Sequence, residues 1–102
     1  MSRMKPTVRR EQILTAAMTI AERDGFNALT RDGIAEEAGV ATGMVNHVFS
    51  TMDKLRKAVM RSAVHKELKP IIATGLSSGM LEAREAPEWL KREALETLMD
   101  EV

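Results

Sequence analysis

The sequence predicts an all-α fold with a three-helix head, a fourth helix and a short helical C-terminal extension. Two observations predict it. Apolar residues recur three, four and seven positions apart in several segments, which is the spacing of one helix face. Aromatic residues make up only 3% of the 102 residues while methionine occurs eight times, so the core must consist of small and flexible side chains. Closely packed helices accommodate such side chains.

The first helix is expected over residues 10–23. Its buried face comprises Ile13, Leu14, Ala17, Met18, Ile20 and Ala21. Gly25 ends it, because glycine accepts the left-handed conformation that is common after a helix. Phe26 and Leu29 follow in the connection and are expected to fill the core.

Two short helices come next. Thr30 stands where an N-cap hydroxyl is expected, and the helix that it opens stops at Gly39. A third helix is expected over residues 42–49, with Val45, Val48 and Phe49 on its buried side. Two short helices around a tight glycine turn predict a helix-turn-helix.

A fourth helix is predicted to open at a capping box in residues 50–53, Ser-Thr-Met-Asp, and to run to about Glu67. Its inward face consists of Leu55, Ala58, Val59, Ser62 and Ala63. Pro70 then breaks or kinks the chain. The apolar residues after it predict a further helical turn or two, and residues 77–79 predict a bend.

Pro87 suits the first turn of a last helix over residues 88–102. One apolar stripe is expected along it, formed by Leu90, Ala94, Leu95, Leu98, Met99 and Val102. An isolated helix of this length is marginal in water. The stripe must therefore pack on the head or on a second copy of the chain.

The charges are unevenly placed although they sum to zero. Residues 1–10 carry a net +4 and residues 51–70 another +4, whereas residues 71–102 carry −4. Ordinary solvated helix faces would explain this pattern. It equally fits a basic surface for phosphates with an acidic end directed away from DNA.

Several function classes find no support in the residues. The absence of cysteine excludes disulfides and zinc-thiolate sites and fits the cytoplasm, and the residues indicate no metal and no cofactor. No apolar run is long enough to span a membrane. The two histidines have no evident carboxylate or nucleophile partner, so an enzyme is not expected.

A fixed order of residues carries a family resemblance. The residues are those at 10–17 (Arg-Glu-Gln-Ile-Leu-Thr-Ala-Ala), 25–26 (Gly-Phe), 30 (Thr), 34–40 (Ile-Ala-Glu-Glu-Ala-Gly-Val), 43 (Gly) and 49 (Phe). Over about residues 8–60 the chain resembles the N-terminal head of the tetracycline-repressor (TetR) family. Core packing alone would explain single apolar positions, but not the order of elements around Gly39. The resemblance implies that double-stranded DNA is the partner.

The third helix is then expected to enter the major groove, where base edges present distinct donors and acceptors. Counting away from its buried positions leaves a set of exposed residues: Ala41, Thr42, Met44, Asn46 and His47. Thr42 can bind a base or a phosphate, Met44 a thymine methyl, and Asn46 an adenine or a phosphate. His47 can donate to a phosphate.

The chain departs from the family pattern at several phosphate-binding positions. It has Ala41-Thr42 where the family usually has Ser and then Lys or Arg, Asn46 in place of a usual Tyr, and Met52 in place of a common Lys. Gly33 also replaces the acidic residue that would complete a capping box, so the second helix is expected to start less firmly. The cations expected to compensate are Arg31, Lys54, Arg3, Lys5, Arg9 and Arg10.

The segment after Lys66 is shorter than the C-terminal ligand-binding domain of TetR-like regulators. A buried inducer pocket, and hence a small-molecule inducer, is therefore not expected. The last helix suits dimerisation instead, through Trp89, Leu90, Leu95, Leu98 and Met99. Folding back onto the head is the alternative.

These observations predict three regions: a flexible basic arm at 1–7, a helix-turn-helix DNA-binding head at 8–52, and a helical connector with dimerisation helices at 53–102. The expected function is a sequence-specific regulator, a repressor, that binds an inverted repeat as a homodimer through helix 42–49. The alternative is an antagonist that binds another protein and has weak or no affinity for DNA.

Overall fold

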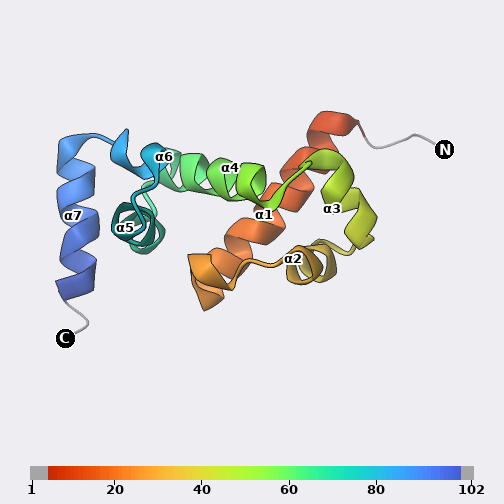
Figure 1. Cartoon of the computed structure of the whole chain (residues 1–102), viewed down its shortest axis with the longest axis horizontal. Helices are drawn as coiled ribbons and strands as arrows, with labels where there is room; N and C mark the ends of the chain where they lie inside the picture. Colours follow the sequence, from red (N-terminus) through yellow and green to blue (C-terminus); the bar gives the residue numbers. More distant parts are fainter. Residues whose placement is uncertain (1–4, 100–102) are drawn as a thin grey trace. The chain divides into compact units, whose positions relative to one another are not determined.

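The computed structural model describes residues 5–99, which form helices joined by short turns (Figure 1). The chain divides into two compact units, one through Arg56 and one from Lys57. The first unit contains α1 (Pro6–Asp24), the 3-10 turn η1 (Phe26–Ala28), α2 (Arg31–Ala38) and α3 (Thr42–Val48). Helix α4 (Met52–His65) begins in the first unit and continues into the second. The all-α prediction is confirmed.

Helix α1 packs against η1, α2 and α3, and the core of the head lies between them. The most deeply buried side chains there are Ile13, Ala17, Leu29, Ile34 and Val45. Phe26 is also buried, so the two connection residues fill the core as predicted. Burial of each large aliphatic side chain stabilises the head by about 1.5–3 kcal/mol.

The predicted start of the first helix was wrong by four residues. Helix α1 begins at Pro6, whose fixed φ suits the first helical position, so Pro6 and Thr7 belong to the helix rather than to an arm. The apolar stripe did not reveal this turn because residues 6–8 are exposed, including Val8.

The ends of α2 follow the prediction in detail. Thr30 is extended, with φ −131°, and its hydroxyl accepts a hydrogen bond from the Gly33 amide at 3.1 Å. Gly39 closes the helix in the left-handed conformation, with φ 71°, and its amide donates to carbonyls of the last turn. Helix α3 ends at Val48, one residue before the predicted end, because Phe49 is extended.

The predicted cap of the fourth helix was wrong by one residue. The hydroxyl of Thr51, not that of Ser50, accepts a hydrogen bond from the Lys54 amide at 3.1 Å. The third position of the helix is thus a lysine, so the reciprocal carboxylate of a capping box is missing. The helix ends at His65, two residues early, and Glu67 takes a positive φ of 58° in the turn that follows.

The second unit adds α5 (Lys69–Ser77), α6 (Leu81–Arg84) and α7 (Glu88–Met99). Pro70 lies in the first turn of α5, and Pro87 directly precedes α7 instead of lying inside it. Gly75 allows close packing in this unit, because a Cβ there would lie 2.8 Å from the Cβ of Ala83 in α6. The one-turn helix α6 was not predicted.

The apolar stripe predicted for α7 is divided in the structure. Leu90 and Ala94 are buried, and α7 packs on α5 within its own unit. Leu90, one of the residues predicted for dimerisation, is thus buried within the single chain. The other predicted dimerisation residues are exposed: Trp89, Leu95, Leu98 and Met99. Val102 lies outside the described residues.

Candidate nucleic-acid interface

Helix α3 turns one side into the head and leaves the other open. Val45 is fully buried, whereas Asn46 and His47 are exposed and the N-cap residue Ala41 is exposed as well. Thr42 and Met44 are half-buried, and so is Val48, which was predicted to lie on the buried side of the helix. Of the five residues expected to be exposed, Ala41, Asn46 and His47 are exposed, whereas Thr42 and Met44 are only partly accessible.

A hollow of about 770 Å³ lies between the first turns of α1 and the side of α3. Its lining residues are Lys5, Pro6, Arg9, Arg10, Met44, His47 and Val48, and we call it the basic groove. Three cations from the start of α1 thus stand beside two of the predicted recognition residues, Met44 and His47. This combination of fixed positive charge and exposed helix suits a phosphate backbone.

Arg10 is held in place by an aromatic contact. Its guanidinium carbon lies 4.9 Å from the centre of the Phe49 ring, within the range of a cation–π interaction. Phe49 is itself buried, so the ring is a fixed support. Arg10 is therefore better ordered than a free surface arginine, and less entropy is lost when it binds an anion.

The other predicted cations lie elsewhere. Arg31 is half-buried at the first residue of α2, and Lys54 is exposed in the first turn of α4; neither lines the basic groove. Arg3 lies outside the described residues. The structure thus brings Lys5, Arg9 and Arg10 together.

Sequence reasoning missed one residue beside the start of α3, Asp32 in the first turn of α2. The Thr42 hydroxyl lies 3.2 Å from Oδ1 of Asp32, the second residue of α2. The two residues are ten positions apart, and only the packing of α2 against α3 brings them together. Nothing in the residue pattern marks Asp32, because an acid in the first turn of a helix is common.

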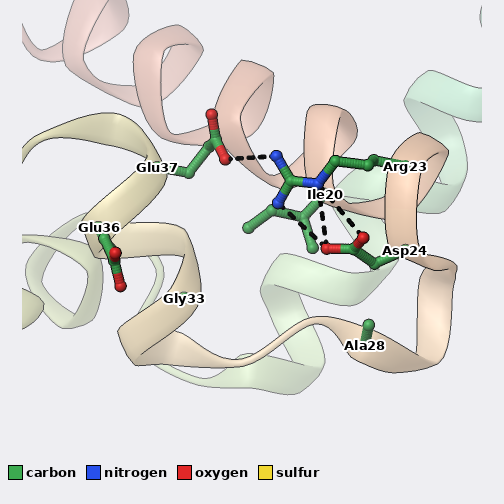
Figure 2. A pocket seen from close by; sticks show the side chains of 7 residues that line it. All are labelled: Ile20, Arg23, Asp24, Ala28, Gly33, Glu36 and Glu37. Carbon is green, nitrogen blue, oxygen red and sulfur yellow. Dashed lines mark hydrogen bonds and ion pairs between the residues drawn. The ribbon is translucent and has the colours of Figure 1, made fainter.

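The C-terminal end of helix α2 is fixed against α1 by two side chains of α1, Gln12 and Arg23. Near the start of α1, the Gln12 amide donates to the Ala38 carbonyl at 3.0 Å. Near its end, Arg23 donates to Glu37 at 3.1 Å and also binds Asp24 (Figure 2). These contacts hold the helix-turn-helix in one orientation on α1.

The end of α1 is acidic. A hollow of about 380 Å³ lies there. Figure 2 shows the residues that line it, which are Ile20, Arg23, Asp24, Ala28, Gly33, Glu36 and Glu37. The hydrogen bonds of Arg23, first to Asp24 and then to Glu37, raise the pKa of its guanidinium above the ordinary value, so this cation is already neutralised by neighbours. Phosphate is repelled here and attracted at the basic groove, so the start of α1 is the end that suits DNA.

Residues 13–59 match the family model described as "Bacterial regulatory proteins, tetR family". The head belongs to this family. Among the described residues of the chain, none of the helices has the length and apolar character to cross a bilayer. The same residues hold no group of three His, Cys, Asp or Glu side chains arranged to bind a metal ion.

Curated relatives agree with the family assignment. The chain is 34% identical over 73 residues to the HTH-type transcriptional regulator BetI of Vibrio atlanticus, which is 72% of this chain and 36% of that protein. It is 32% identical over 104 aligned positions to BetI of Brucella suis, covering 85% of this chain and 52% of that protein. The chain thus spans about a third to a half of the length of these relatives. No solved structure gave a significant match.

Proposed function

We propose that this protein is a sequence-specific, DNA-binding transcriptional regulator that inserts α3 into the major groove. The observation that carries the proposal is the position of the exposed side of α3 directly beside the basic groove, within a TetR-family head. The groove cations bind phosphates and fix the register, while the exposed residues of α3 contact base edges. Binding that only occupies DNA excludes other proteins from it, so we propose repression.

The proposed regulator is a cytoplasmic homodimer on an inverted repeat. One head of this size makes few base contacts and does not reach the affinity of about 10⁻⁸ M or tighter that specific sites show. Two heads related by a two-fold axis present two recognition helices about 34–36 Å apart, or at a multiple of one helical turn of DNA. They therefore bind two inverted half-sites.

The surface proposed for the dimer is the outward side of α7, occupied by a second copy. Leu95 and Met99 are exposed one turn apart, and Arg92 and Glu96 are exposed beside them. In an antiparallel pair of α7 helices, Arg92 of one copy meets Glu96 of the other while Met99 meets Trp89. This side of α7 is thus complementary to itself in charge and in apolar character, as a two-fold interface requires.

The test is binding to duplex DNA from upstream of the protein's own gene, at several salt concentrations. The variant Asn46→Ala should weaken specific binding by about 1–3 kcal/mol and leave thermal stability unchanged, since Asn46 is exposed. Asn27→Ala is the matched control, because Asn27 is an exposed asparagine in η1, away from α3.

If Asn46→Ala and Asn27→Ala lose the same specific affinity for DNA, α3 is not the helix that recognises the bases. A wild-type protein that binds no duplex, at any salt concentration, would refute the regulator and favour the protein-binding antagonist. Steep loss of affinity with rising salt is expected of the regulator only, because cations must compete for the phosphates that the basic groove binds.

A further inference from the structure

The contact between Asp32 and Thr42 joins the first turns of α2 and α3. Thr42 Oγ1 and Asp32 Oδ1 are 3.2 Å apart. A carboxylate has no hydrogen to give, so the threonine hydroxyl is the donor. Asp32 is exposed and Thr42 is half-buried, so both polar groups remain accessible beside the side of α3 proposed to face DNA.

This hydrogen bond determines what the pair can bind. With its only hydrogen directed at Asp32, the Thr42 hydroxyl offers lone pairs, and so does the second carboxylate oxygen of Asp32. Phosphate oxygens offer lone pairs as well, and their charge repels the carboxylate. The pair therefore cannot hold the DNA backbone, and it needs a ligand with hydrogens to donate.

In the major groove only two base groups donate hydrogens: the N4 amino group of cytosine and the N6 amino group of adenine. Adenine also presents the acceptor N7 next to its amino group, which an acceptor-only pair repels. Cytosine presents its amino group beside an apolar C5–H edge. We propose, on the basis of the proposed function, that Asp32 and Thr42 together bind the amino group of one cytosine in each half-site.

Under this proposal, two parts of the interface bind different chemical groups of the DNA. The basic groove contains Lys5, Arg9 and Arg10 and contacts phosphates, whereas the start of α3 contains the acceptor pair and contacts a base. The N-terminal residues of a recognition helix are the ones that reach base edges in helix-turn-helix proteins, so Thr42, the first residue of α3, is in the appropriate position.

The experiment is selection of bound sites from a random duplex library by the full chain, followed by affinity measurements on the selected site. Wild type should enrich sites with cytosine at one fixed position of each half. Replacing that C·G pair by T·A should lower affinity about 5- to 140-fold, because the thymine O4 then faces two acceptors. Asp32→Asn should lose the cytosine preference at that position and keep the preferences elsewhere.

Two further variants test the hydroxyl. Thr42→Val removes it with little change of shape and should weaken the same preference, whereas Thr42→Ser keeps it and should preserve the preference. Glu36→Gln controls for the lost charge, because Glu36 is an exposed acid of α2 that lines the acidic hollow instead. It should change affinity for all sequences alike, without altering any base preference.

The outcomes separate this assignment from the proposed function. If Asp32→Asn changes affinity equally for every sequence, as Glu36→Gln does, the pair reads no base and the assignment is wrong while the regulator stands. Enrichment of guanine or thymine at the position affected by Asp32→Asn would also overturn it. If wild type enriches no duplex, the proposed function fails and the assignment fails with it.

Discussion

Removing two cations from the basic groove should flatten the salt dependence of DNA binding. The double variant Lys5→Gln, Arg9→Gln leaves Arg10 in place, because the contact of Arg10 with Phe49 also stabilises the fold. Each phosphate neutralised contributes about 0.9 to the slope of log affinity against log salt. The slope should therefore decrease by up to about 1.8 for one head and up to about 3.6 for a dimer.

The same slopes give the size of the change in affinity that an experiment would measure. Raising salt fourfold, from about 50 to 200 mM, should cost wild type up to roughly 12-fold more affinity than the variant for one head, and up to roughly 150-fold more for a dimer. Fluorescence anisotropy with a labelled duplex measures both slopes. The loss should be similar on specific and unrelated duplexes, because phosphates carry no sequence information.

A matched control removes two charges from the second unit. Lys66 and Arg84 are exposed there and lie outside the groove lining, so Lys66→Gln, Arg84→Gln changes the net charge equally. Its slope should remain that of wild type. If the groove variant and the control have the same slope, the basic groove does not contact phosphate and the proposed orientation of the head on DNA is wrong.

Four further variants test packing and assembly. Gly75→Ala should lower the free energy of unfolding in urea by about 1–3 kcal/mol, because its Cβ would lie 2.8 Å from a Cβ of α6; an unchanged midpoint would contradict this. Leu95→Glu with Leu98→Glu should give a folded monomer in sedimentation with much weaker operator binding, since both side chains are exposed within the chain; a wild-type monomer at micromolar concentration would refute the dimer. Gly43→Ala should raise thermal stability by about 0.5–1 kcal/mol, since a Cβ there meets nothing within 4 Å. Gly33→Ala should raise thermal stability less than Gly43→Ala does, or lower it, since its Cβ would lie 2.8 Å from the capping hydroxyl of Thr30. An equal gain in thermal stability for Gly33→Ala and Gly43→Ala would disprove that steric argument.

The helices of the head could be predicted because their signals are local. A capping threonine at 30 and a left-handed glycine at 39 determine the ends of α2 within the backbone of that segment alone. The start of α1 was missed because apolar periodicity marks only a buried face, and its first turn is exposed. Helix α6 has four residues, which is too few for any periodicity to be recognised.

The last helix shows where periodicity misleads. Ala94 and Leu95 are consecutive, so their side chains point about 100° apart around the helix. The predicted stripe included both residues. It therefore combined the side of α7 that packs on α5 with the side that faces outward. The sequence could not separate them, because the position of α5 relative to α7 depends on the turns between them.

The candidate interface was predictable on a single helix but not between helices. The exposed residues of α3 follow from its buried positions, but the basic groove requires that the start of α1 lie against α3, and the Asp32–Thr42 contact requires that α2 lie there too. The zero net charge of the chain is misleading for the same reason. Helix α1 has 19 residues and is therefore about 28 Å long, nearly three Debye lengths at moderate salt. The acidic hollow at its end is screened from the basic groove at its start, so phosphate at the groove experiences the local cations rather than the net charge of the protein.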